Sequence, residues 1–491
     1  MFEQGGNAAD AAVAAAVALV VVEPTNNGIG SDAFAIVCEC DRLIGLNASG
    51  RSPAALGPAQ LAGRHSMPLL GWETVTVPGA VSAWKSLSDR FGKLPFERLF
   101  EPAIAYATAG CMAAPMVVEQ WRLVADLYGN MPDFCDAFLP EGRVPEIGEL
   151  FTIDGLAASL ESIARSGGED LYRGELAIKI VAHAAATGGY LVAADLEAHR
   201  ADWVEPIGIR YKDWELHELP PNGQGLAALI ALGILAQLPL GDCAVDSADS
   251  IHLQIEAMKI GVADAARSVA DPDFVTIETS ELLSDTYLAH RASQIDPSKA
   301  GDPGATAAEG GDTVYLTTAD ESGMMVSYIQ SNFFAFGSGI VIPGTGISMQ
   351  SRGSGFTLDP GHPNCLAPSK RPFHTIIPAF LSREGRPVMS FGVMGGPMQP
   401  QGHLQVALRI AEYGQNPQAA IDAPRWQAMG GVNVAVEQAV AAPVREELQR
   451  RGHQVHVEGP ITFGGAQACY RLPHGYLAAS EPRKDGHAAG R

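Results

Sequence analysis

A threonine that follows a flexible linker is the residue best placed for chemistry in this sequence. Thr313 comes after the Gly-, Ala- and Ser-rich segment 298–311 and one intervening residue, and it opens a run of β-branched and aromatic residues typical of a strand. A chain cut before Thr313 would carry nucleophile and base on one residue, because an α-amine has a pKa of about 7.7–8.0. Local sequence alone favours the ordinary interpretation, a strand-forming threonine.

The sequence lacks the signatures of the commoner catalytic classes. It contains no G-x-S-x-G motif, no Walker loop, no G-x-G-x-x-G and no H-E-x-x-H zinc motif. Its seven cysteines are scattered without C-x-x-C spacing, which indicates free thiols rather than a metal or redox site. Since an N-terminal threonine supplies its own base, we expect neither a metal nor an organic cofactor.

The charge of the chain limits its partners. The formal net charge is −22 and no run of Lys or Arg occurs, which argues against a nucleic-acid partner. An anionic substrate would need a local basic pocket, and Arg51 and Arg352 lie in stretches otherwise poor in charge.

No signal-peptide pattern opens the chain, and the apolar stretch 8–22 contains Asp10 and is too short to span a bilayer. We expect a cytoplasmic protein without membrane contact.

Hydrophobic patterns predict the elements that would position these residues. An N-cap at Asn7 and a stop at Glu23-Pro24 bound a core helix. Further helices are predicted at 99–109, 176–186 and 403–412, and most of segment 81–240 has a helical pattern. Short apolar runs between glycine turns predict strands at 33–37, 43–46, 325–330, 339–342, 376–381 and 388–392. This order of elements favours a sheet between helical layers.

Stretches spread over most of the chain resemble the γ-glutamyltranspeptidase family. In the first half they are GGNAADAAVAAAVALVVVEP (5–24), GIGSDAF (28–34), VPGAVSAW (77–84), LPFERLFEPAIAYATAG (94–110), LYRGELA (171–177) and EPIGIRYKDWELHELPPNGQG (205–225). In the second half they are FGSGIVIPGTGI (336–347), LAPSKRPFHTIIP (366–378) and DAPRW (422–426). Together these stretches are highly specific, and the chain resembles an N-terminal-nucleophile hydrolase of that family.

The resemblance implies a precursor that cuts itself between Asp312 and Thr313. The freed threonine would then open substrate amides through an acyl-enzyme. The implied fold is α+β, a four-layer αββα sandwich shared by a helix-rich large fragment, 1–312, and a small fragment, 313–491, as one intertwined catalytic unit. Thr313 would lie at the end of a central strand.

Other roles are implied at positions that match the family's motifs. Ser331 falls where the family keeps a hydroxyl that hydrogen-bonds the nucleophile; the ordinary interpretation is a plain strand serine. Gly395 and Gly396 match the backbone pair that binds the oxyanion, worth about 3–4 kcal/mol in such sites, with a simple turn as the alternative. Arg51 falls where the family binds the substrate carboxylate.

The pocket for the substrate's α-amine departs from the family pattern. Gly355 stands where an aspartate is expected, and Arg352 where glutamine or glutamate is expected. Phe333 replaces an asparagine, and His374-Thr375 replace paired serines. These changes resemble divergent members that include oxamate amidohydrolases and cephalosporin-type acylases, so we expect a small anionic amide as substrate.

Two other functions stay open. The first is γ-glutamyl transfer or glutathione hydrolysis, against which the altered amine pocket argues. The second is a non-catalytic homologue, against which the presence of Thr313, Ser331 and the glycine pair argues.

The expected partners are the small substrate and the two fragments of one precursor, and a homodimer also stays open. Family members usually carry a strand and a helix before the first glycine pair, so we expect a misassigned start codon.

Overall fold

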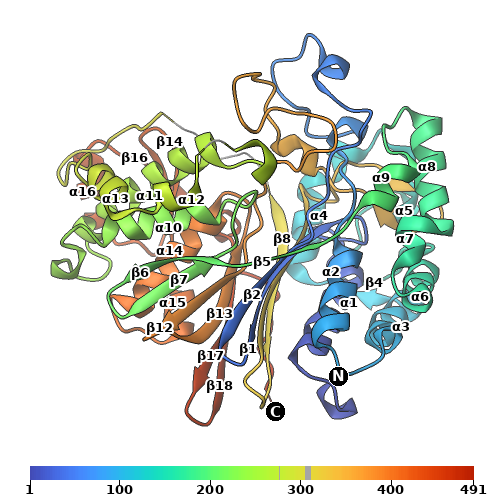
Figure 1. Cartoon of the computed structure of the whole chain (residues 1–491), viewed down its shortest axis with the longest axis horizontal. Helices are drawn as coiled ribbons and strands as arrows, with labels where there is room; N and C mark the ends of the chain where they lie inside the picture. Colours follow the sequence, from blue (N-terminus) through green and yellow to red (C-terminus); the bar gives the residue numbers. More distant parts are fainter. Residues whose placement is uncertain (276, 305–310, 491) are drawn as a thin grey trace.

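Two large sheets with helices on their outer sides make up the protein (Figure 1). The computed structural model describes residues 1–275, 277–304 and 311–490, except for the side chain of Asp312. Part of the predicted linker, residues 305–310, lies outside the described residues. Helices and strands both contribute extensively, so the predicted α+β class is confirmed.

The first sheet has five strands, all in antiparallel pairs. In spatial order they are β5 (Asp202–Val204), β2 (Arg42–Asn47), β1 (Asp32–Glu39), β9 (Met325–Phe333) and β8 (Asp312–Ala319). Thr313 therefore lies at the start of an edge strand, and the prediction of a central strand is wrong. Contacts of β8 with β13 and β17 cover this edge strand from the second sheet.

The second sheet has six strands, also in antiparallel pairs. In spatial order they are β18 (Gly475–Ser480), β17 (Gly465–Leu472), β13 (Arg386–Met394), β12 (Ala379–Arg383), β7 (Trp214–Glu218) and β6 (Ile207–Tyr211). A smaller sheet contains β14 (Trp426–Gly430), β15 (Asn433–Glu437) and β16 (Gln454–Glu458). Two short pairs are β3 (Cys111–Met112) with β4 (Leu150–Phe151), and β10 (Val341–Ile342) with β11 (Ile347–Ser348).

Both large sheets take strands from either side of residue 312. In the first sheet, β1, β2 and β5 precede that residue, β8 begins at it and β9 follows it. In the second, only β6 and β7 precede it. Separating the two sides would remove ladder hydrogen bonds that buried backbone groups require. Neither side of the chain can therefore complete its sheets alone.

Strand β1 explains why the sequence shows an unbroken apolar run there. Successive side chains of a strand point to opposite faces. The odd-numbered residues of 33–37 belong to the core that holds the first helix, whereas the even-numbered residues of 34–38 belong to a core shared with Phe380 of the second sheet. Because both faces of β1 are covered, no alternating polar pattern is needed.

Helices pack on the outer side of each sheet (Figure 1). One group contains α1 (Ala8–Val22), α2 (Ala80–Phe91), α3 (Glu101–Ala109), α4 (Pro115–Tyr128), α5 (Pro132–Phe138), α6 (Leu156–Ser166), α7 (Glu169–Arg173), α8 (Glu175–Thr187) and α9 (Ala193–Ala198). The remaining helices are α10 (Gly225–Leu235), α11 (Ala248–Ser268), α12 (Thr279–Leu282), α13 (Asp285–Ala292), α14 (Met398–Ala411), α15 (Pro417–Asp422) and α16 (Ala442–Arg450). Among all helices in the described part of the chain, none is long and apolar enough to cross a membrane.

Most predicted elements are present, with one clear exception. Helix α1 has the bounds expected, because the side chain of Asn7 and the carboxylate of Asp10 each accept the other residue's backbone N–H. The predicted strands 33–37, 43–46, 325–330 and 388–392 are confirmed within β1, β2, β9 and β13. Strands β5–β7 interrupt the segment predicted to be mostly helical. They are too short for a clear periodic signal and pair with β2 and β12, far away in the sequence.

Candidate active site at the start of strand β8

Thr313 is fully buried and lies opposite a β-bulge of strand β9. Positions 312 and 314 pair with 333 and 330, so Thr313 alone opposes two residues of β9, Ser331 and Asn332. A bulge of this kind bends its strand and re-aims a side chain, and bulges are frequent beside active sites. The structure thus places Ser331 opposite Thr313, as a role for both in one site requires.

Gln399, in the first turn of α14, contacts the Thr313 hydroxyl. Its Nε2 donates a hydrogen bond to Oγ1 of Thr313 at 3.3 Å. The backbone N–H of Ile377 donates to Oε1 of the same amide at 3.0 Å, which determines which end of the amide faces the threonine. Gln399 is fully buried, so this orientation is held away from solvent.

Gly395 and Gly396 form the turn between β13 and α14. Their φ angles are +120° and +53°, which glycine adopts without strain. The carbonyl of Gly395 accepts from the N–H of Met398 at 3.0 Å, and in a trans peptide the N–H of Gly396 points the opposite way. A Cβ added to Gly311 would lie 3.0 Å from the nitrogen of Gly396. The turn therefore packs against the backbone just before the predicted cut.

A second buried glutamine, Gln224, lies directly before α10 and is hydrogen-bonded to this turn. Its Nε2 donates to the carbonyl of Thr375 at 2.6 Å and to the carbonyl of Gly396 at 2.9 Å. Its own backbone N–H donates to the carbonyl of His374 at 2.9 Å. Gln224 thus joins the predicted pocket residues 374–375 to the predicted oxyanion turn.

Arg352 is fully buried and links further predicted residues. Nη1 donates to Oγ1 of Thr375 at 2.7 Å, and Nη2 donates to Oγ of Ser331 at 3.1 Å. The guanidinium carbon lies 4.7 Å from the ring centroid of Phe333, within the range of a cation–π contact. Phe333 has φ +77°, which is uncommon for a bulky residue and indicates local strain. The structure therefore brings Arg352, Phe333, Thr375 and Ser331 together.

A buried carboxylate, Asp32, balances the charge of Arg352. Asp32 pairs with Ser331 across β1 and β9, and it accepts from Nε2 of His374 at 3.1 Å and from the N–H of Gly50 at 3.0 Å. Burial raises the pKa of Asp32 to about 6 although Arg352 opposes the rise, and burial lowers the pKa of Arg352 to about 9. Burial, followed by Arg352, holds the pKa of His374 well below its usual value, so the imidazole is neutral.

Several buried polar atoms beside Arg352 have no hydrogen-bond partner among the described residues. They are Nε of Arg352, Oγ of Ser351, Oε1 of Gln350 and Nδ2 of Asn332. Buried polar groups almost always bind something, so such atoms mark a place for water or a polar ligand. Asn332 belongs to the bulge opposite Thr313, so of these atoms its Nδ2 belongs to a residue next to the candidate nucleophile.

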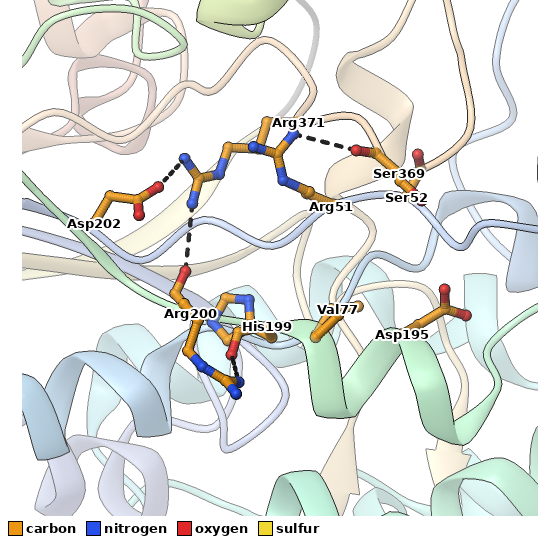
Figure 2. A pocket seen from close by; sticks show the side chains of 10 residues that line it. Arg51, Ser52, Val77, Asp195, His199, Arg200, Asp202, Ser369 and Arg371 are labelled. Carbon is orange, nitrogen blue, oxygen red and sulfur yellow. Dashed lines mark hydrogen bonds and ion pairs between the residues drawn. The ribbon is translucent and has the colours of Figure 1, made fainter.

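Arg51 lines a cavity of about 260 Å³ (Figure 2). Its Nη1 binds Oδ2 of buried Asp271 at 2.6 Å and donates to the carbonyl of Ser369 at 3.2 Å. Arg371 in the same cavity binds Asp202 at 2.7 Å. Among the described residues, none that lines this cavity lies opposite Thr313 or is hydrogen-bonded to it. The N–H of Gly50, the residue before Arg51, donates to Asp32, so the backbone at Arg51 adjoins the buried group. The Arg51 guanidinium itself is paired with Asp271, and its carboxylate-binding role stays a prediction.

One buried cluster has the side chains of a metal site: His252 and Glu256 on α11, with His453 after α16. The carboxylate of Glu256 is already paired with Nζ of Lys259 at 2.8 Å. Nε2 of His252 must donate to the carbonyl of Asp296 at 2.8 Å, so its Nδ1 accepts from Nε2 of His453, also at 2.8 Å. Two neutral imidazoles fit these two hydrogen bonds, with Nδ1 of His453 left without a partner among the described residues, and a metal cation would meet the Lys259 ammonium. The cluster therefore fits a hydrogen-bonded anchor better than a metal site.

The burial of this histidine pair predicts that the folded protein becomes less stable as pH falls. Burial, followed by Lys259, lowers the pKa of His453 to about 3, below its unfolded value of about 6.5. The unfolded chain binds more protons below pH 6.5, so stability is lost as pH falls from about 6.5 towards 3. In His453→Gln the slope of the unfolding free energy against pH should fall by about 1.4 kcal/mol per pH unit, because one fewer proton is taken up on unfolding. Urea unfolding between about pH 4 and 7 measures the slope.

The matched control is His456→Gln, at an exposed histidine three residues further along the same segment. It should keep the wild-type dependence of unfolding free energy on pH. An unchanged slope in His453→Gln would show that His453 is not buried as a neutral imidazole in solution.

Three of the residues that build this site were not predicted from the sequence: Asp32, Gln224 and Gln399. Asp32 and Gln224 lie inside the quoted stretches 28–34 and 205–225, and Gln399 follows the glycine pair by three positions. A charged residue at the start of an apolar strand was the available signal for Asp32. The glutamines gave no comparable signal, because a polar residue in a first helical turn is ordinary.

Comparisons with known proteins cover the whole chain. The profile of the family described as Gamma-glutamyltranspeptidase matches residues 1–491. Over 504 residues, 100% of this chain and 95% of the relative, it is 35% identical to the glutathione hydrolase-like YwrD proenzyme of Bacillus subtilis. Over 508 residues, with the same coverage, it is 35% identical to the oxamate amidohydrolase proenzyme of Klebsiella pneumoniae subsp. pneumoniae. The crystal structure of a cephalosporin acylase from Bacillus halodurans matches with TM-score 0.94 and 46% identity, over 99% of this chain and 92% of that one.

Proposed function

Because the chain belongs to the gamma-glutamyltranspeptidase family, we propose that it is a self-processing amidohydrolase that opens a small anionic amide through an acyl-enzyme on Thr313. Membership makes it an enzyme of the N-terminal-nucleophile class. The names of both curated relatives end in proenzyme, which supports a precursor of two fragments. The substrate and the residues that act on it are part of the proposal.

The proposed cut lies between Asp312 and Thr313 and divides the chain into 1–312 and 313–491. In the precursor, Oγ of Thr313 adds to the carbonyl carbon of Asp312, the peptide C–N bond breaks, and the hydroxyl proton ends on the new amine. Water then hydrolyses the ester and leaves a free carboxylate. The intermixed strands support a mature enzyme in which both fragments stay associated, and the helices outside two facing sheets support an αββα sandwich.

In the mature enzyme, the α-amine of Thr313 takes the proton from Oγ, and Oγ adds to the substrate carbonyl. The N–H of Gly396, and that of Gly395 with it, would stabilise the oxyanion. The substrate nitrogen leaves with the proton, and water resolves the acyl ester. Ser331, opposite Thr313 across the bulge, is the proposed hydroxyl partner of the nucleophile.

The observation that carries the substrate class is the group of unpartnered buried polar atoms around Arg352, beside the bulge. A small carboxylate could accept from Nε of Arg352, and a buried guanidinium favours an anion. An α-ammonium in this place would instead face Arg352, and a buried unpaired charge costs several kcal/mol. The oxamate amidohydrolase relative supports this substrate class.

A substrate panel on the processed enzyme tests the proposal. We expect kcat/KM for oxamate to exceed that for a γ-glutamyl anilide by at least about tenfold, because only the latter brings an α-ammonium to Arg352. An acyl-lactam amide belongs in the same panel, since a cephalosporin acylase is among the similar structures. A tenfold preference for the γ-glutamyl donor would replace the anionic-amide proposal with γ-glutamyl hydrolysis or transfer.

A further inference from the structure

The amide of Gln399 is held so that only its nitrogen can face the nucleophile. The N–H of Ile377 is a donor and needs an acceptor, so Oε1 of Gln399 must face it, at 3.0 Å. The opposite end, Nε2, then donates to Oγ1 of Thr313 at 3.3 Å. Gln399 and Thr313 are both fully buried, so no bulk water competes for this contact.

The backbone of Gln399 is directly connected to the predicted oxyanion turn. The N–H of Gln399 donates to the carbonyl of Gly396 at 3.2 Å, so its backbone is part of that turn. Gln224 binds the same carbonyl at 2.9 Å. The donor to the nucleophile and the turn that would bind the oxyanion are therefore fixed to each other within one short segment.

We propose that Gln399 is a further catalytic residue, a hydrogen-bond donor that orients Oγ of Thr313 for attack in both self-cleavage and turnover; this inference rests on the proposed function. An oxygen that accepts from Gln399 keeps its own hydrogen free to point towards a base and a second lone pair free for the carbonyl carbon. The donor also stabilises negative charge on Oγ as its proton leaves. Gln399 itself gains and loses no proton.

The competing role for Gln399 is purely structural, as an acceptor that satisfies the buried N–H of Ile377. Two substitutions separate the roles. Gln399→Glu keeps an oxygen for Ile377 and, assayed at a pH where its carboxyl group is ionised, has no donor for Thr313. Gln399→Met removes both the acceptor for Ile377 and the donor to Thr313 while keeping a similar side-chain volume.

The experiment measures two rates on full-length precursor, self-cleavage on a denaturing gel and amide hydrolysis by any processed protein. We expect both Gln399→Met and Gln399→Glu to slow self-cleavage and lower kcat by about ten- to a hundredfold, with little change in KM. Gln405→Met is the matched control. Gln405 is buried on the same helix, its Oε1 accepts from the N–H of Trp426, and its Nε2 donates to carbonyls of Gln401 and Trp426. The Gln405→Met protein should cleave itself and hydrolyse the amide substrate at wild-type rates.

The outcomes distinguish this inference from the proposed function. A wild-type chain that is never cut before Thr313 refutes the proposed function itself. A wild-type chain that is cut, with Gln399→Glu cut and active at the wild-type rate, refutes the donor role alone and leaves the acceptor role. If Gln405→Met slows as much as Gln399→Met, the effect belongs to the helix packing and the donor role is refuted. Thermal melting of each uncut protein shows whether a variant has folded.

Discussion

The Thr313→Ala protein is expected to remain one uncut chain and to hydrolyse no amide above background. Without Oγ, neither the ester that precedes self-cleavage nor the acyl-enzyme can form, and removal of a nucleophile typically lowers kcat by about 10⁴-fold or more. Thr313 is fully buried, and alanine removes a hydroxyl bonded to Gln399 without adding volume, so the fold should persist. Denaturing electrophoresis and intact mass measure the result.

The control for this substitution is Thr317→Ala, at a threonine on the same strand β8. The hydroxyl of Thr317 contacts that of Ser390 in the second sheet, so it too is a polar contact, though a partly buried one. Thr317→Ala should be cut like wild type. N-terminal sequencing of the wild-type small fragment should begin at Thr313; any other start, in an active preparation, would remove Thr313 from its role.

Arg352→Gln is expected to reverse the substrate preference. It removes the buried guanidinium, and Asp32 then loses the cation that favours its charged form. A carboxylate substrate loses its partner, while an α-ammonium no longer faces a buried guanidinium. Removing one member of a buried charge pair commonly costs about 2–5 kcal/mol, so the ratio of kcat/KM for oxamate to that for a γ-glutamyl anilide should fall by about a hundredfold or more.

The ratio serves as an internal control, because general damage to the fold lowers both rates together. Arg352→Lys is the matched variant. It keeps a positive charge but cannot make the two separate hydrogen bonds to Thr375 and Ser331, and should keep the sign of the preference with reduced rates. A ratio unchanged in Arg352→Gln would show that Arg352 acts only in holding Thr375 and Ser331, and that the substrate lies elsewhere, with Arg51 as the next candidate.

Local sequence patterns were sufficient for elements whose signals lie within a few residues. The capping box of Asn7 and Asp10 sets the start of α1, and glycine spacing sets the strand–turn–helix around Gly395 and Gly396. The α+β class and the family also follow from the chain itself. The altered amine pocket was visible as Arg352 and Phe333 in unexpected positions, since a change of side-chain type needs no structure to be seen.

Which residues meet at the nucleophile was decided by tertiary structure. Asp32 reaches Ser331 through a pairing of strands about 300 positions apart, a separation across which no periodicity carries information. The edge position of β8 depends on the order of strands in the finished sheet, and the bulge that sets Thr313 opposite Ser331 depends on a one-residue register shift. Gln399 faces Thr313 only because the N–H of Ile377 orients its amide. The sequence by itself determined the residue types available for chemistry, whereas packing of both halves of the chain decided their partners, because hydrogen-bond direction and burial exist only in the assembled core.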